Sequence, residues 1–376
     1  MIVQRFLAWA PTAPAAQRAE GAGALARAYL YSGLSNSDRQ DAEAALTMLL
    51  DDPCVDVRRN IAEALAPSFF APRHIIEALA HDSPEVAVPV LMLSPVLQDG
   101  ELIELLPIRG DEEQAAIAAR GRLPASVSGA LAEIGSAMSC AVLARNPLAE
   151  ITPRAFARLT ERHGRDASVR DALLDRTDLP IAERQKLVLK VAESLGETAI
   201  SRFNLDNERV RRMMEDACER ATLALASDLP AVGPLVRHLR ETGQLTAGLV
   251  LRALLNGEMD FVEAAFAELT DVEPERVRQL MGDPVRTGFR ALYQNAGLPL
   301  SIYSAFREAF EAWAELREIG ISGAEARRHV AERALAMAET AELGGAAALL
   351  KRMAADAARE QAREHLKPRQ IASRAA

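Results

Sequence analysis

An all-helical fold of stacked helical hairpins is predicted by three features of the sequence. Segments that end an amphipathic helix recur with successive spacings of 28, 26, 25 and 31 residues, at Ala66, Ser94, Arg120, Arg145 and Arg176. Alanine and leucine supply most of the 49% apolar residues, whereas aromatic residues make up only 4%, and this composition suits closely packed helices. No sustained alternation of Val, Ile and Thr indicates a strand.

The segment DDPCVDVRRNIAEALA at residues 51–66 shows the repeating pattern most completely. Asp52 is predicted to be the N-cap of its helix, with Pro53 at the first helical position, where a missing N–H costs nothing. The apolar residues that follow recur at helical spacing and predict one buried stripe of Val57, Ile61, Ala64 and Leu65. Arg58 and Arg59 are interpreted as part of a solvated face.

Other helices are predicted on both sides of this segment. One ends near residues 31–33, the next is capped at Ser35, and Ser83 and Pro84 open a helix with Val86, Val90 and Leu93 as its stripe. Partner helices are expected near 99–106, 125–134, 153–162 and 181–195. A two-helix unit of this length cannot bury its apolar face alone, so successive units are expected to stack.

The chain exceeds the size at which one compact core stops growing, so several regions are predicted. They are an N-terminal helical segment 1–40, a repeat array 41–227, a second helical array 228–320, and C-terminal helices and a tail rich in Ala, Glu and Arg, 321–376. Residues 196–207 are predicted to form a loop. Pro230 and Pro234 place a subdomain boundary in 228–245.

Several segments resemble known families. The run Asp52-Pro53-x-x-x-Val57-Arg58-x-x-x-Ala62-x-Ala64-Leu65 is similar to the second helix of a HEAT repeat, although the units are shorter and lose the Val-Arg pair after the first. The segments MLLDDPCVDVRRNIAEALAPS, SPEVAVPVLMLSPVL, LDRTDLP, LVLRALLNGEMDFVEAAFAELT and GFRALYQNAGLP resemble a bacterial, chiefly alphaproteobacterial, family known as domain of unknown function 2336. The resemblance covers roughly residues 40–320 and implies an α-α superhelix, a HEAT-like α-solenoid, with no catalytic residues to transfer.

Charge and composition narrow the classes of function. The net charge of −9 repels nucleic acid and anionic membranes. No apolar run is long enough to span a membrane, and the N-terminus lacks the pattern of a secretory signal. The cysteines at 54, 140 and 218 are far apart, and we expect them to be buried reduced thiols in a cytoplasmic protein.

The sequence offers little chemistry. His74, Glu77 and His81 share one helix face, but a metal site would need further ligands from another helix, so no metal site is predicted. No nucleophile elbow, P-loop, dinucleotide-binding motif or HExxH motif is present. We therefore predict no catalytic residues and no cofactor, and we expect the protein not to be an enzyme.

The most specific surface feature is the series Arg120, Arg145 and Arg176, which end three consecutive units in the same position. If the units stack regularly, three guanidinium groups would line one edge and bind phosphate or an acidic partner. The alternative is that each arginine meets the negative C-terminus of a helix or a nearby aspartate.

The predicted function is that of a scaffold or adaptor whose stacked helices bind a protein partner. One alternative is a nucleic-acid-binding protein that uses the arginine-lined face. Another is a regulator that senses a small ligand at the junction 228–245. Residues 322–366 carry only a thin apolar stripe, and this predicts self-association as a further possibility.

Overall fold

The computed structural model describes residues 8–203, 206–227, 229, 231–282, 287–339 and 344–366. Helices dominate these residues, and no strand occurs among them apart from an isolated parallel bridge between Leu123 and Ala149. The all-helical prediction is therefore confirmed. The chain divides into two compact units, Met1–Leu195 and Gly196–Ala376, called unit 1 and unit 2 below.

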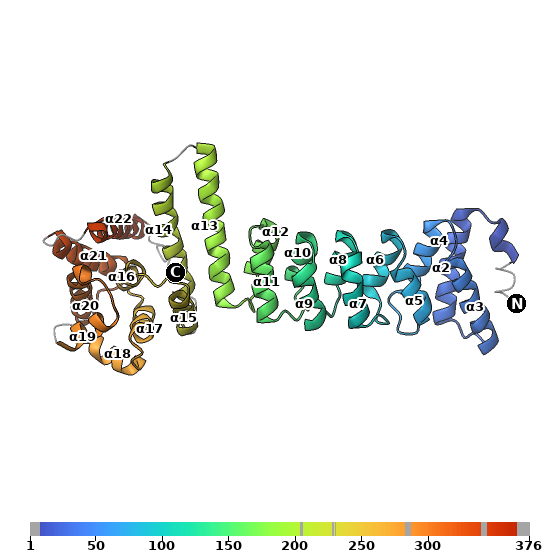
Figure 1. The fold of residues 1–376 in the computed structure, drawn as a ribbon, viewed down its shortest axis with the longest axis horizontal. Coiled ribbons are helices and arrows are strands. Elements are labelled where there is room, and N and C mark those ends of the chain that lie inside the picture. The colour runs from blue at the N-terminus through green and yellow to red at the C-terminus, as the bar shows by residue number, and fades with distance from the viewer. Residues whose placement is uncertain are drawn as a thin grey trace, which may run out of the picture. The chain divides into compact units, whose positions relative to one another are not determined.

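Unit 1 is built from short helices in two rows (Figure 1). In one row each even-numbered helix packs on the next, from α2 to α12, and in the other α7 packs on α9 and α9 on α11. The bounds are α2 Ala15–Tyr31, α3 Asn36–Leu49, α4 Val55–Leu65, α5 Arg73–Ala80, α6 Pro84–Leu93, α7 Asp99–Leu105, α8 Asp111–Ala118, α9 Ala125–Ile134, α10 Ala137–Arg145, α11 Pro153–His163, α12 Ala167–Leu174 and α13 Ile181–Phe203. Short 3-10 helices lie at η1 Ala10–Thr12 and η2 Leu106–Ile108.

The predicted caps and stripes mostly form. Ser35 and Thr152 accept hydrogen bonds from Asp38 and Ala155, so each begins its helix as expected. The four predicted partner helices appear as α7, α9, α11 and α13. Two stripe positions differ, because Ala64 is half-buried and Leu93 is exposed, while Ala62 and Leu91 are buried instead.

The predicted start of the helix in segment 51–66 is wrong. Helix α4 begins at Val55, with Cys54 as its N-cap, two residues after the predicted N-cap Asp52. The Asp52 carboxylate accepts hydrogen bonds from Arg18 Nε at 2.8 Å and from the Cys54 amide at 2.8 Å. The guanidinium of Arg18 also holds the pKa of Asp52 below its usual value. A partner 34 residues earlier therefore decides where this carboxylate lies.

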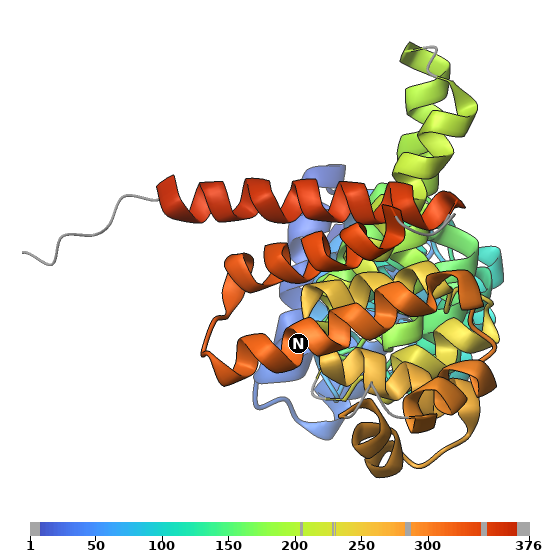
Figure 2. The same ribbon diagram turned by 90° about the vertical axis from the view of Figure 1, so that its left-hand side faces the viewer.

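Unit 2 contains the remaining helices and an aromatic core. Their bounds are α14 Asn207–Ser227, α15 Gly233–Glu241, α16 Ala247–Asn256, α17 Met259–Thr270, α18 Pro274–Met281, α19 Thr287–Asn295, η3 Leu300–Ile302, α20 Tyr303–Glu318, α21 Gly323–Glu339 and α22 Gly344–Leu366. Helices α20, α21 and α22 lie side by side (Figure 2). The ring of Phe266 meets those of Phe289, Tyr293 and Phe306 at centroid distances of 6.0, 6.4 and 6.3 Å.

The predicted loop 196–207 is wrong over most of its length. Helix α13 continues through Gly196 to Phe203, and α14 begins at Asn207. Gly196 is buried where the α14 side chain of Met214 crosses it, and a Cβ at this position would lie 1.9 Å from the Met214 sulfur. Glycine usually weakens a helix interior by about 1 kcal/mol, but here it permits close packing.

The division between the units falls inside α13, earlier than the boundary predicted in 228–245. Helix α14 belongs to unit 2, because its Asp216 and Glu219 pair with Arg252 of α16. Part of the predicted junction is helix α15, which has Pro234 in its first turn. Residues 228 and 230 lie outside the described residues.

The C-terminal stripe has a partner within the chain. Leu349, Leu350, Met353 and Ala357 of α22 are buried, and α22 packs on α21 and α16. Self-association through 322–366 stays a prediction. The predicted tail from Lys367 to Ala376 lies outside the described residues.

Cys140 is expected to resist alkylation in the native protein. The three cysteines form no disulfide with one another, and Cys140 is buried whereas Cys54 and Cys218 are half-buried. Burial raises the pKa of the Cys140 thiol to about 11, so at pH 8 only about 0.1% is the reactive thiolate. Mass spectrometry after iodoacetamide treatment at pH 8 should show Cys140 unmodified without denaturant and modified in urea. Equal modification of Cys140 in both conditions would contradict this prediction.

Candidate interaction surface

Arg120 lies against the end of the preceding even-numbered helix. Its Nη1 and Nη2 donate to the carbonyls of Leu91 and Ser94, both at 2.6 Å, at the C-terminus of α6. Burial lowers the pKa of Arg120, although an arginine so placed stays protonated at neutral pH. The guanidinium thus satisfies carbonyls that the helix end leaves without partners.

Arg176 lies two units further along the chain, after α12, and is placed in the same way as Arg120. Its Nη1 donates to the Asn146 carbonyl at 2.8 Å, just after α10, and its Nη2 pairs with Asp178 at 2.7 Å. The guanidinium also lies over the Phe156 ring, 5.5 Å from its centroid. Its side chain is only 10% exposed, so little of it faces solvent.

Arg145 is placed differently from the other two arginines. It is exposed, and its Nη2 donates to the Ser168 carbonyl at 3.3 Å. The neighbouring Asn146 takes the carbonyl-binding role, since its Nδ2 donates to the carbonyls of Ala118 and Arg120 at 2.9 Å. Arg145 and Arg176 together border a pocket of about 430 Å³, and Arg120 does not line it.

Other arginines also link units, at positions that sequence reasoning missed. Arg162 donates to the carbonyls of Ala132 and Gly135 at the end of α9. Arg58, interpreted from the sequence as solvated, instead pairs with Asp82 at 2.6 Å and is mostly buried. Each arginine lies 24–30 residues from its partner in the sequence, which is about one helical pair. This spacing is the sequence signal that could have identified these arginines.

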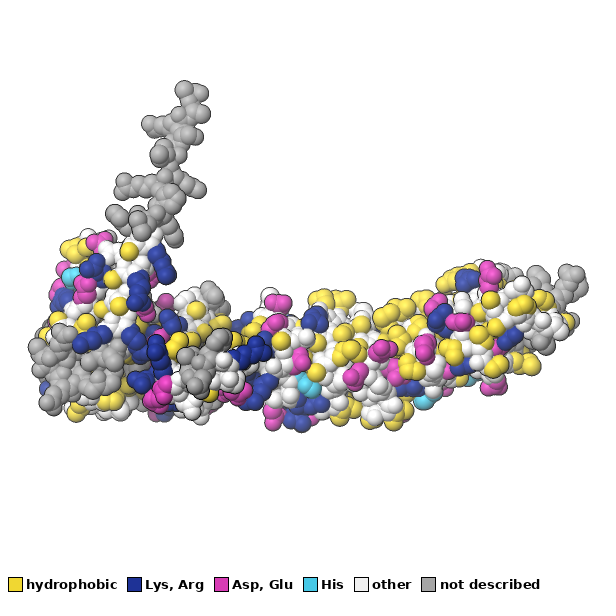
Figure 3. All heavy atoms as spheres, turned by 90° about the horizontal axis from the view of Figure 1, so that it is seen from above, with side chains coloured by type: hydrophobic (Ala, Val, Ile, Leu, Met, Phe, Trp, Pro, Cys, Tyr) yellow, Lys and Arg dark blue, Asp and Glu magenta, His cyan; other side chains and the backbone are white. Residues whose placement is uncertain are grey.

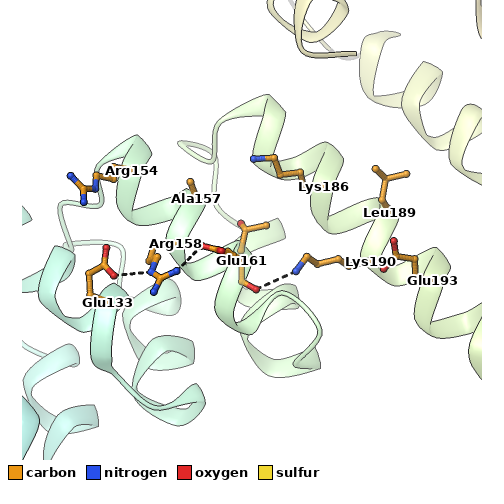
Figure 4. A pocket seen from close by; sticks show the side chains of 10 residues that line it. Glu133, Arg154, Ala157, Arg158, Glu161, Lys186, Leu189, Lys190 and Glu193 are labelled. Carbon is orange, nitrogen blue, oxygen red and sulfur yellow. Dashed lines mark hydrogen bonds and ion pairs between the residues drawn. The ribbon is translucent and has the colours of Figure 1, made fainter. Parts of the chain in front are cut away.

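A surface depression of unit 1 lies between α11 and α13, and we call it the α11–α13 groove (Figure 4). Its volume is about 700 Å³. Its lining residues come from α9, α11 and α13: Glu133, Arg154, Ala157, Arg158, Thr160, Glu161, Lys186, Leu189, Lys190 and Glu193. Apart from Thr160, the lining positions on α11 and on α13 follow the pattern i, i+3, i+4, i+7, so one face of each helix lines the groove.

A row of alternating charges crosses the groove (Figure 4). Arg158 bridges Glu133 and Glu161 at 2.7 and 2.6 Å, and Lys190 Nζ donates to the Glu161 carbonyl at 3.3 Å. Glu193 lies beyond Lys190 at the α13 end of the row (Figure 4). Within this row Arg158 pairs with two carboxylates, and Lys190 bonds, among the described residues, only to a backbone carbonyl. Glu193 pairs with Arg165 at 3.5 Å, outside the row, so the row presents charges of both signs.

Arg154 and Lys186 lie away from this row, toward the N-terminal ends of their helices (Figure 4). Arg154 is exposed and makes no hydrogen bond or ion pair with another described residue, whereas Lys186 pairs with Glu183 at 2.8 Å. Arg154 is the second residue of α11, and the partial positive charge of that helix N-terminus adds to its own charge. This end of the groove therefore attracts an anionic group.

The floor of the groove is less polar. Ala157 and Leu189 are half-buried, and the Thr160 side chain is 1% exposed. The Thr160 hydroxyl is buried and has no hydrogen-bond partner among the described residues. A small apolar floor between charged walls suits the side chains of a bound polypeptide segment.

Unit 1 also exposes apolar side chains outside the groove. Phe69 and Phe70, in the loop between α4 and α5, are each 79% exposed. Hydrophobic side chains reach the surface at several places over unit 1, among charged ones (Figure 3). Exposed aromatic residues are frequent energetic anchors of protein interfaces.

The described residues offer no grouping of three or more His, Cys, Asp or Glu side chains suited to a metal ion. His74 lies near Thr47 and Glu43, and His81 Nδ1 is 2.8 Å from the Glu77 carbonyl of its own helix. In the part of the chain that the structure describes, no helix combines the length and apolarity needed to cross a membrane.

Comparison with known proteins identifies a family. Among curated proteins and solved structures, none matches this chain. A family model described as an uncharacterised protein conserved in bacteria (DUF2336) matches residues 86–344, which include the whole α11–α13 groove. The match confirms the bacterial family suggested by the sequence, whereas alphaproteobacterial origin stays a prediction. Because the model covers more than half of the sequence, the chain belongs to the bacterial family DUF2336.

Proposed function

We propose that this protein is a non-enzymatic adaptor that binds an acidic segment of a protein partner in the α11–α13 groove. The groove itself carries the proposal: about 700 Å³ of open space, a half-buried apolar floor, and cations at one end. A polypeptide that docks between two helices uses apolar side chains for affinity and charged ones for orientation.

We also propose that unit 1 is a HEAT-like superhelical array. Its even-numbered helices pack in sequence from α2 to α12, and the carbonyls at helix ends are bound by side chains about one pair away. Such nearest-neighbour packing holds each helix at a fixed place relative to the next. A rigid groove loses less conformational freedom on binding than a mobile one, which favours affinity.

The partner segment is expected to be acidic where it meets Arg154 and Lys186. The row from Glu133 to Glu193 carries charges of both signs, so it favours polar or alternating charges in the partner. This arrangement gives the bound segment one preferred direction. We place the interaction in the cytoplasm, because the three cysteines form no disulfide and reducing compartments maintain thiols.

Nucleic-acid binding gains no support from the placement of the three predicted arginines. The guanidinium groups of Arg120 and Arg176 donate to backbone carbonyls, and of the three arginines only Arg145 is exposed. The net charge of −9 also opposes association with a polyanion. A role of the three arginines in partner binding stays a prediction.

The groove can be tested by photocrosslinking in a native bacterial host. A benzophenone amino acid at Ala157, on the groove floor, should crosslink a specific protein, whereas the same group at exposed Ala78 of α5 should not capture it. The captured protein is then purified and its Kd measured. Substituting Arg154→Glu together with Lys186→Gln should weaken binding at least tenfold, because acidic partner groups lose their cations.

A matched variant separates this effect from a change in net charge. Arg27→Glu with Arg122→Gln removes the same charge at exposed positions of unit 1 outside the groove, and its Kd should equal that of the wild type. Circular dichroism should show all variants folded. Equal Kd values for the groove variant and the wild type would reject the proposed site.

A further inference from the structure

Unit 2 contains a pocket of about 390 Å³ that the proposed function does not use. It lies among α14, α16, α21 and α22, and we call it the arginine pocket. Five of its lining side chains are guanidinium groups: Arg220, Arg252, Arg327, Arg359 and Arg363. Lys and Arg side chains (dark blue) are also prominent over the side of unit 2 that carries α22 (Figure 3).

Arg252 is the fixed centre of this pocket. Its side chain is only 2% exposed, and its Nε donates to Glu219 of α14 at 2.9 Å. Its Nη2 forms an ion pair with Asp216, one turn earlier on the same helix. A charge so deeply buried requires such partners, and they hold the guanidinium in one position at the pocket wall.

The carboxylates around the pocket are too few for its arginines. Asp216 is shared, since Arg220 approaches it at 2.9 Å and Arg352 at 4.0 Å in addition to Arg252. Asp356 likewise lies near both Arg359, at 2.8 Å, and Arg220, at 3.9 Å. Such sharing leaves uncompensated positive charge in a protein whose net charge is −9.

Arg363 shows that the cluster is more than a means of holding α22 in place. Arg327 links α21 to Glu360 of α22 at 2.9 Å, which is a structural role. Arg363 is exposed at the pocket and makes no ion pair or hydrogen bond with any other residue that the structure describes. Its charge is therefore available to a ligand.

The rest of the lining defines the class of ligand. Leu255 and Met353 provide apolar surface, and Asn256 provides an amide that can both donate and accept hydrogen bonds. Guanidinium groups bind phosphate through two parallel hydrogen bonds. The volume lies within the range of sites for small organic molecules. We propose that the arginine pocket binds a small organic phosphate of nucleotide size.

In this arrangement the phosphates contact the guanidinium groups, and the apolar part of the ligand lies against Leu255 and Met353. The proposal is independent of the α11–α13 groove, because the two sites share no residue. A ligand bound there would contact both α14 and α22 and would stabilise their packing against each other.

The test is isothermal titration of the intact chain with ATP, pyrophosphate and adenosine, at constant ionic strength set with chloride. ATP should bind with the lowest Kd and adenosine at least tenfold more weakly, because the phosphates supply the charge-assisted contacts. The variant Arg363→Gln should weaken ATP binding about tenfold, as expected for the loss of one charged hydrogen bond. Arg363 has no bond to lose in the fold, so this variant should remain folded.

The control is Arg328→Gln on α21, which removes an exposed arginine that bonds to Glu332 and to Gln361 and does not line the pocket. Its Kd for ATP should equal that of the wild type. No binding of ATP at millimolar concentration, an equal Kd for adenosine and ATP, or binding of pyrophosphate without ATP would each overturn the proposal. Equal losses in the Arg363 and Arg328 variants would also overturn it, because they would indicate only a general charge effect.

Discussion

Replacing Phe266 with alanine is expected to destabilise unit 2 by about 3–5 kcal/mol, the range for removing a large aromatic side chain from a core. Phe266 is fully buried, and its ring meets those of Phe289 and Phe306 at centroid distances of 6.0 and 6.3 Å. Urea denaturation followed by circular dichroism measures the change. Because unit 1 has its own core, unit 2 of the variant should unfold at a lower urea concentration than unit 1. The first transition should therefore remove only part of the helical signal.

Phe69→Ala is the matched control, since it removes the same side chain where 79% of it is exposed. Its free energy of unfolding should stay within about 0.5 kcal/mol of the wild type. Similar unfolding curves for Phe266→Ala and the wild type would contradict the aromatic core of unit 2.

Arg176→Met is expected to destabilise unit 1 by about 1–3 kcal/mol, because it leaves part-buried carbonyls without donors. The side chain is only 10% exposed and donates to the Asn146 carbonyl at 2.8 Å. It also holds the pKa of Asp178 below its usual value through their hydrogen bond. Urea denaturation at pH 7 measures the loss.

Arg145→Met should change the free energy of unfolding by less than about 0.5 kcal/mol, because Arg145 is exposed and makes one long hydrogen bond. The pair of variants therefore separates a structural role from an interaction role within the predicted arginine series. If Arg176→Met were as stable as Arg145→Met, the carbonyl contacts of Arg176 would contribute nothing to folding.

Most of the helices could be predicted because helix formation depends on near neighbours. Caps such as Ser35 and Thr152, and apolar stripes such as Val57, Ile61 and Leu65, lie within one or two turns of the residues that they affect. The wrongly predicted loop at 196–207 has a different cause. Gly196 indicates a loop in isolation, but packing of Met214 against it keeps α13 helical.

The candidate sites were harder to predict than the helices. The spacing of Arg120, Arg145 and Arg176 suggested three equivalent residues, yet Asn146 rather than Arg145 bonds to the preceding helix end. The α11–α13 groove combines residues from three helices between positions 133 and 193, and none of its short segments has a recognisable motif.

The sequence by itself determined the helical class, several helix limits in unit 1 and the family of this protein, because periodicity and capping are local properties. Only the tertiary structure decided the division of the units inside α13, the places of Asp52 and Arg176, and the two pockets. Each of these depends on contacts between residues about one helical pair or more apart. The physical reason is that a buried charge or carbonyl must find a partner, and packing decides which partner is near.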